Sequence, residues 1–146
     1  MKEEYDWEVY EMFKDQLERE IPTISLNISL LREEKDISEI VNQLFRNFHT
    51  YKSLSAYLNL LTLNKLVSKT EIVLSSLRDK KETLQESIIE WLESISKQLT
   101  LYFDEMQNNC TNLSELPPLL LSSIEMTQEY INPKNILKTL SILYMD

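Results

Sequence analysis

The sequence predicts an all-α fold, an up-and-down helical bundle with a four-helix core and an additional C-terminal helix. Three observations predict it. The chain contains no glycine, its apolar residues recur at three- and four-residue spacing over long stretches, and short polar or proline-marked breaks separate these stretches. Tight β-hairpins depend on glycine for their left-handed turn positions, so a sheet protein is not expected. With 146 residues the chain fits one domain that buries a substantial core.

The first two helices are predicted on either side of the charged break Arg32–Asp36. The first apolar stripe runs from Val9 to Leu31, and Pro22 falls inside it. We therefore expect the helix either to kink at Pro22 or to restart with the proline in its first turn. The second stripe follows the break and runs from Ile37 to Leu58 on one helix face.

Two further core helices and a C-terminal region follow. The third helix is predicted to begin near Thr62, a residue type favoured at the N-cap. The fourth is predicted to open at Thr83–Glu86, which has the spacing of a capping box. A polar loop with two prolines then leads to a helix that ends at about Ile131. We expect residues 1–132 to form the bundle, and residues 133–146 to form a short helix or the start of a linker.

Composition excludes several classes of function. The net charge of −9 argues against binding to nucleic acid, whose phosphates attract clustered Lys and Arg. No apolar run is long enough to cross a bilayer, and the N-terminus lacks the pattern of a signal peptide. Without glycine there is no P-loop and no dinucleotide fingerprint, and a single cysteine offers no metal cluster. We expect a soluble, cytoplasmic protein that binds no membrane, cofactor or metal.

His49, the only histidine of the chain, is the main candidate for chemistry. It lies in the second helix, about 120° around the helix from the centre of the apolar stripe. This position is at the edge of the core, exposed on one side. Arg46 and Lys52 lie one helical turn away, so an anion attached to the imidazole is partly neutralised.

The hairpin of the second and third helices predicts a partner for His49. If the two helices run antiparallel about a turn near Leu60 and Leu61, His49 lies opposite Glu71. Glu71 is about 80° from the apolar stripe of its own helix, so it also lies at the core edge. A carboxylate that accepts a hydrogen bond from one ring nitrogen leaves the other nitrogen as an exposed nucleophile. A phosphoryl-accepting histidine needs this arrangement.

The segment around His49 resembles a known signature. Histidine phosphotransfer (HPt) domains carry Phe-Arg, two residues, then His, Ser or Thr, an aliphatic residue, Lys and Gly. This chain has Phe45, Arg46, His49, Thr50 and Lys52 in that register. The resemblance extends from about residue 5 to about residue 131. It is strongest to the N-terminal phosphotransfer domain of the bacterial chemotaxis histidine kinase.

The resemblance implies a role for each site residue. His49 is the phosphoryl acceptor, Glu71 orients the imidazole and Lys52 is a neighbour of the phosphate. Further binding residues are Arg46, Phe45, Ser53, Leu54 and Ala56. The partners implied are the ATP-binding domain of a histidine kinase, which donates the phosphoryl group, and the receiver domain of a response regulator, whose aspartate accepts it. We expect a monomeric carrier without independent catalysis, either on its own or as the first domain of a longer kinase.

Two departures from the family pattern keep alternatives open. Ser53 and Asn59 stand where the family usually has glycine. Serine is small enough to leave the imidazole accessible, and asparagine tolerates the left-handed conformation of a helix end. One alternative is a degenerate adaptor or inhibitor that binds kinase or receiver domains without carrying phosphate. Another is a plain helical scaffold, which predicts that His49 is buried or far from Glu71.

Overall fold

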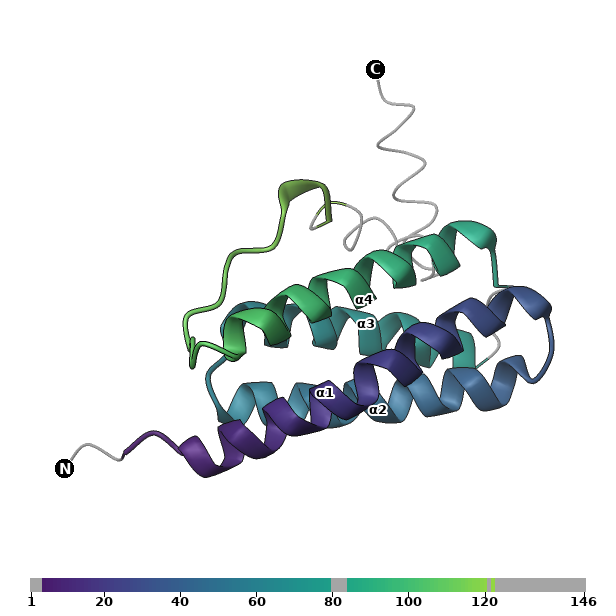
Figure 1. The fold of residues 1–146 in the computed structure, drawn as a ribbon. Helices are drawn as coiled ribbons and strands as arrows, with labels where there is room; N and C mark the ends of the chain where they lie inside the picture. Colours follow the sequence, from purple (N-terminus) through teal and green to yellow (C-terminus); the bar gives the residue numbers. More distant parts are fainter. Residues whose placement is uncertain (1–3, 80–83, 121, 123–146) are drawn as a thin grey trace, which may run out of the picture.

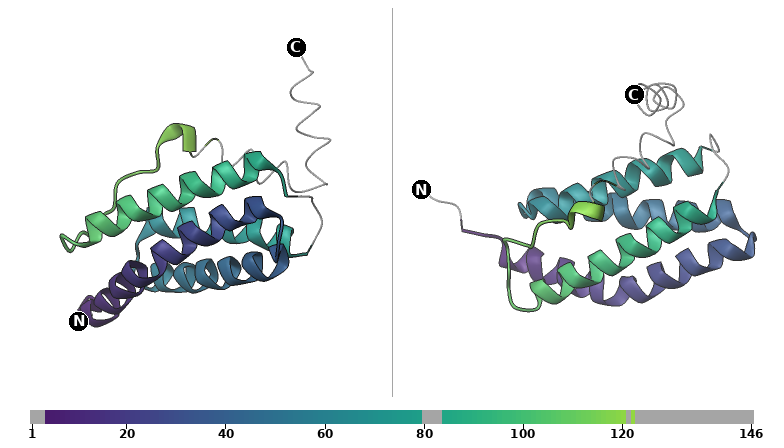
Figure 2. Two further views of the ribbon diagram at one scale, coloured as in Figure 1. Left: turned by 45° about the vertical axis from the view of Figure 1, so that its right-hand side comes forward. Right: turned by 90° about the horizontal axis from the view of Figure 1, so that it is seen from above.

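The computed structural model describes residues 4–79, 84–120 and 122, and within them the chain is an all-α bundle. Its elements are α1 (Trp7–Leu30), a 3-10 turn η1 (Leu31–Glu33), α2 (Ile37–Tyr57), α3 (Leu61–Arg78) and α4 (Glu86–Met106). Consecutive helices run in opposite directions, with α1 beside α4 and α2 beside α3 (Figure 1 and Figure 2). The predicted up-and-down bundle is confirmed. Helical backbone begins again at Pro118, but the rest of the predicted C-terminal helix and residues 133–146 lie outside the described residues.

Helix α1 continues through Pro22 and does not restart there. Its N-cap is Asp6, whose Oδ1 accepts a hydrogen bond from the Val9 N–H at 3.1 Å. Pro22 has no N–H, so the carbonyl of Glu18 loses its helical hydrogen bond. Both residues are exposed, and water can satisfy that carbonyl. Of the two outcomes predicted for Pro22, the restart is therefore wrong.

Two predicted helix caps are wrong, although the third helix does begin near Thr62. Helix α3 begins at Leu61 with Leu60 as its N-cap, so Thr62 lies inside the first turn. Helix α4 begins at Glu86, and its N-cap Gln85 makes no capping side-chain bond. A capping box would have placed Glu86 at the third helical position. Instead Glu86 is the first helical residue, and its Oε1 accepts a hydrogen bond from Arg32 Nε at 2.7 Å.

The turn between α2 and α3 sets the register of these two helices. Asn59 has a φ of 56°, in the left-handed region that asparagine tolerates better than most residues. Asn64 Nδ2 then donates to the carbonyl of Lys52 at 3.0 Å and to Ser55 Oγ at 3.1 Å. The glycine-free turn is thus closed by one asparagine in the left-handed conformation and locked by another.

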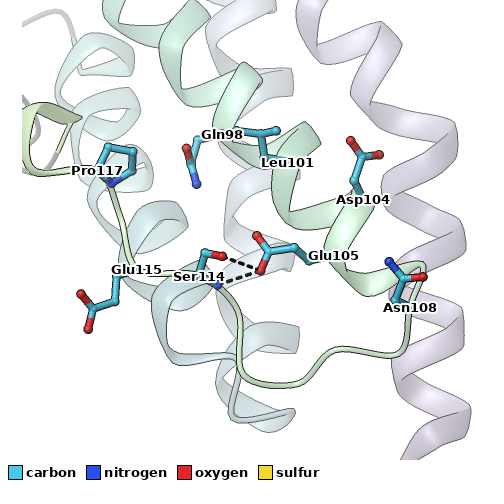
Figure 3. Close-up of a pocket in the computed structure, with 8 residues that line it drawn as sticks. All are labelled: Gln98, Leu101, Asp104, Glu105, Asn108, Ser114, Glu115 and Pro117. Atoms are coloured by element: carbon cyan, nitrogen blue, oxygen red, sulfur yellow. Dashed lines mark hydrogen bonds between the residues drawn. The ribbon is translucent and has the colours of Figure 1, made fainter.

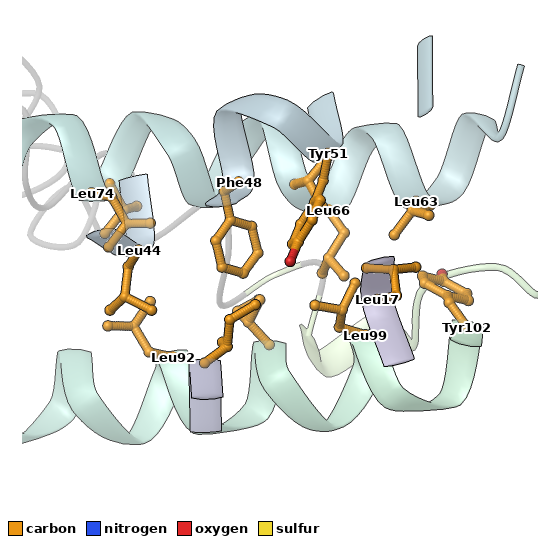
Figure 4. Close-up of a cluster of buried hydrophobic side chains, with 14 of the residues drawn as sticks. Leu17, Leu44, Phe48, Tyr51, Leu63, Leu66, Leu74, Leu92, Leu99 and Tyr102 are labelled. Atoms are coloured by element: carbon orange, nitrogen blue, oxygen red, sulfur yellow. The ribbon is translucent and has the colours of Figure 1, made fainter. Parts of the chain in front are cut away.

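One hydrophobic core receives side chains from all four helices (Figure 4). Burying one leucine or phenylalanine side chain completely stabilises the fold by roughly 1.5–3 kcal/mol relative to leaving it exposed. The hydroxyl of the buried Tyr51 donates to Glu20 Oε1 at 2.6 Å, which joins α2 to α1. The labelled core residues are Leu17 from α1, Leu44, Phe48 and Tyr51 from α2, Leu63, Leu66 and Leu74 from α3, and Leu92, Leu99 and Tyr102 from α4.

The buried tyrosines predict a loss of stability at alkaline pH. Burial raises the pKa of Tyr10, Tyr51 and Tyr102 above the ordinary tyrosine value. The unfolded chain therefore releases these protons first, starting near pH 10. The stabilisation is complete below about pH 10 and declines as the pH rises above it. We expect the urea midpoint to fall between about pH 8 and about pH 10.5.

Tyr51→Phe is the matched variant for this prediction, because it removes one of the titrating hydroxyls and keeps the ring. Its urea midpoint should fall less over the same pH interval than that of the wild type. Lysines titrate in the same range but are common to both proteins, so the difference between the two falls isolates the tyrosine. Equal falls in the two proteins would contradict the assignment.

The segment after α4, residues 107–117, folds back onto the bundle. The Tyr10 hydroxyl lies 2.6 Å from the carbonyl oxygen of Cys110 and 3.2 Å from that of Met106. Glu105 Oε1 accepts hydrogen bonds from the N–H of Ser114 at 2.7 Å and from its hydroxyl at 3.0 Å (Figure 3). The segment and α4 together line a surface pocket that contains no residue of α2 or α3. None of the described helices is both long and apolar enough to span a bilayer.

Candidate functional site

The structure brings His49 and Glu71 together across the α2–α3 hairpin. Nδ1 of His49 lies 3.1 Å from Oε2 of Glu71. The side chain of His49 is 60% exposed and that of Glu71 only 13%, so the carboxylate is a sheltered anchor for an accessible ring. The antiparallel hairpin predicted this pairing. The scaffold alternative required a buried or distant histidine, and the geometry is the opposite.

The contact with Glu71 assigns different roles to the two ring nitrogens of His49. An ionised carboxylate has no proton to donate, so the hydrogen of the bond belongs to Nδ1. In the neutral imidazole the other nitrogen, Nε2, then keeps its lone pair. Because Nδ1 is occupied and the ring is exposed, Nε2 is the atom available to an incoming electrophile.

Lys52 shares the same carboxylate. Its Nζ lies 3.4 Å from Glu71 Oε1, so the two oxygens of Glu71 contact His49 and Lys52 separately. The lysine side chain is 46% exposed and can move toward an anion bound nearby. In the free protein it partly neutralises Glu71. The site thus combines an exposed imidazole, a carboxylate that accepts from its Nδ1 and an exposed ammonium group.

Phe45 packs beside the imidazole. The two rings are stacked, with centroids 5.7 Å apart and planes 18° from parallel. Phe45 is half-buried against the core, so it offers His49 a firm apolar surface. The stack and the hydrogen bond to Glu71 together restrict rotation of the imidazole.

The other predicted binding residues lie around this centre with weaker ties to it. Arg46 is exposed, and its Nη2 donates to Gln43 Oε1 at 3.1 Å, not to the imidazole. The hydroxyl of Ser53 donates to the carbonyl of His49 at 3.4 Å and stays on the helix surface. Leu54 is half-buried on the core and Ala56 is exposed.

Sequence reasoning missed Arg78. Its Cζ lies 4.2 Å from the centroid of the Phe45 ring, a cation–π contact. Arg78 follows Glu71 by two helical turns, so both side chains emerge on the same side of α3. Phe45 precedes His49 by one turn on α2. Extending the hairpin pairing by one turn places Phe45 opposite residue 75, within one helical turn of this arginine.

Two further findings concern metal binding at the site and the family of the chain. Among the residues that the structure describes, no group of three or more His, Cys, Asp and Glu side chains is arranged to hold a metal ion. The family model for the Hpt domain matches residues 8–115, a span that includes His49, Lys52, Glu71 and Arg78. No curated protein and no solved structure matches the chain.

Proposed function

The chain belongs to the Hpt domain family, and on this premise we propose that it carries a phosphoryl group on Nε2 of His49. Membership implies a phosphotransfer role in two-component signalling. One observation supports the choice of Nε2 as the phosphorylated atom. Nδ1 of His49 lies 3.1 Å from Glu71, and the side chain is 60% exposed, so the other nitrogen is accessible.

The acceptance step needs no base. The lone pair of Nε2 attacks the γ-phosphorus of ATP held by a kinase domain, a P–N bond forms, and the bond from phosphorus to the leaving ADP oxygen breaks. The ring keeps its proton on Nδ1 and becomes an imidazolium that bears the phosphoryl group. Glu71 then faces a positive ring instead of a neutral one, so its attraction is stronger after the attack than before.

The donation step reverses these changes. A carboxylate oxygen of a receiver aspartate attacks the phosphorus, the P–N bond breaks, and its electron pair returns to Nε2. The products are an acyl phosphate on the receiver and a neutral imidazole still bonded to Glu71. Because no proton enters or leaves, the same side chains serve both directions of transfer.

The partners follow from this chemistry and from the resemblance in sequence. The donor is the ATP-binding domain of a histidine kinase and the acceptor is a response-regulator receiver. Similarity to the phosphotransfer domain of the chemotaxis kinase supports transfer from kinase to receiver in a bacterial, chemotaxis-type system. We expect the chain to act in the cytoplasm. We also expect it to be a monomer, because a phosphocarrier must meet two partners in turn.

The decisive experiment uses a small phosphoryl donor, so that no partner has to be known. Purified chain is incubated with phosphoramidate, and intact mass spectrometry follows the addition of one phosphoryl group. We expect a single adduct that is labile in acid and stable in base. A kinase domain with labelled ATP, followed by a receiver domain, then tests the direction of transfer. A folded chain that docks a receiver but accepts phosphate from neither donor would overturn the proposal in favour of the adaptor alternative.

Lys52 should stabilise the incoming phosphoryl group. In Lys52→Ala we expect phosphorylation of His49 to slow by roughly two- to fivefold, the effect of one exposed charge. Lys52→Arg should recover much of the rate, and added salt should reduce the difference between the variants. Lys65→Ala is the matched control, because Lys65 is an exposed lysine of α3 but lies about 120° around that helix from Glu71. Equal rates in Lys52→Ala and Lys65→Ala would contradict a specific role.

A further inference from the structure

We propose that Arg78 is a positioning residue of this site, which holds Phe45 in place and through it holds the imidazole of His49. The inference rests on the proposed function of His49 and extends it to a side chain that touches neither the imidazole nor the phosphoryl group. It is carried by a row of contacts that joins Arg78 to Phe45, Phe45 to His49, and His49 to Glu71.

The row of contacts begins and ends on α3 and passes through two residues of α2. Arg78 and Glu71 come from α3, and Phe45 and His49 come from α2. Glu71 holds the edge of the imidazole at Nδ1, while Phe45 lies beside its face. A hydrogen bond alone leaves a ring free to swing about the bond axis, and a stack alone leaves it free to slide. The two contacts together define the direction of Nε2.

Phe45 is itself incompletely held by the core. It is half-buried, whereas its neighbours Leu44 and Phe48 on α2 are fully buried. The guanidinium of Arg78, with its Cζ 4.2 Å from the ring centroid, supplies the contact that the core does not. Arg78 is also tied locally, because its Nε lies 3.5 Å from Asp79 Oδ1. This second contact orients the guanidinium at the end of α3.

A role in positioning is distinguishable from a role in stability. The side chain of Arg78 is 37% exposed, and exposed contacts of this kind contribute little to the free energy of unfolding. Reaction rates are more sensitive, because a nucleophile must be held in line with the bond that breaks. Loss of Arg78 should therefore lower the phosphorylation rate while leaving the free energy of unfolding nearly unchanged.

The experiment compares Arg78→Gln, Arg78→Lys and the control Arg19→Gln, in which an exposed arginine of α1 is replaced. Phosphoramidate is the donor, so that docking of a partner protein does not enter. Arg78→Gln should lower the phosphorylation rate roughly two- to fivefold. It should also reduce the share of the Nδ1–H tautomer in ¹⁵N NMR spectra of His49. Arg78→Lys should be intermediate, and Arg19→Gln should match the wild type in rate, tautomer and urea midpoint.

A double-mutant cycle with Phe45→Leu tests the route. If Arg78 acts through Phe45, Arg78→Gln has no further effect on rate or tautomer once the aromatic ring is gone. An unchanged rate and tautomer in Arg78→Gln would overturn the inference, as would an effect that persists in full in the Phe45→Leu background. A tautomer shift in Arg78→Gln without phosphorylation of the wild type would uphold the positioning role and reject the phosphocarrier function, so the two proposals fail separately.

Discussion

Replacing His49 with glutamine is expected to abolish phosphorylation of the chain and leave the bundle folded. Glutamine is similar in length to histidine, but its amide nitrogen has no available lone pair with which to attack phosphorus. Because the His49 side chain is 60% exposed, the substitution should change the free energy of unfolding by no more than about 0.5 kcal/mol. Labelling with phosphoramidate or with a kinase domain and labelled ATP measures the first effect, and urea unfolding measures the second.

The chemistry of any residual label identifies an error in this assignment. A phosphohistidine is lost in acid and survives base, whereas an acyl phosphate on Asp or Glu is lost in base. Since the chain has no second histidine, acid-labile and base-stable label should be absent from His49→Gln. Undiminished label of any kind in His49→Gln would show that the phosphoryl group resides elsewhere.

Replacing Glu71 with alanine is expected to lower the phosphorylation rate roughly 10- to 100-fold, by analogy with the effect of removing a carboxylate that orients a metal-ligating histidine. Two causes add. Nδ1 loses the acceptor that keeps the proton away from Nε2, and the imidazolium formed on transfer loses its counter-charge. Single-turnover rates with phosphoramidate test the first statement. The tautomer ratio of His49 in ¹⁵N spectra tests its cause.

Glu71→Gln separates the two causes. Its amide oxygen can still accept a hydrogen bond from Nδ1, but it carries no charge, so we expect a rate between those of Glu71→Ala and the wild type. Glu90→Gln is the matched control, because Glu90 is an exposed glutamate of α4. If Glu71→Ala transferred phosphate as fast as Glu90→Gln, the contact with His49 would be without consequence for the reaction.

The central pair of the site was predictable from the sequence because it depends only on helix geometry and on one short turn. Periodicity places His49 and Glu71 at the core edge of their helices, and a hairpin about residues 60 and 61 sets them opposite each other. Arg78 was missed although the same geometry extends to it. Its partner is an aromatic ring, and a contact of a cation with a ring leaves no charge pattern in the sequence to search for.

Arg46 illustrates the limit of reasoning from spacing alone. One turn from His49, it was expected to neutralise an anion on the ring, yet its guanidinium donates to Gln43 on the outer surface of α2. Helical spacing brings two Cβ atoms near each other but does not decide the rotamer of a long, exposed side chain. Lys52, at similar spacing, lies toward α3 because Glu71 attracts it.

By itself the sequence determined the number and faces of the core helices in the described residues, the antiparallel hairpin and the exposed position of its only histidine. These properties follow from the periodicity of apolar residues, which is a local signal repeated over many turns. Only the tertiary structure decided where α3 and α4 begin, that α1 passes through Pro22, and which side chains meet Glu86, Tyr51 and Phe45. The side-chain pairings are single contacts between segments distant in the sequence, so they become defined only when the helices have packed. The helix ends depend on local backbone geometry that the apolar periodicity does not fix to the residue.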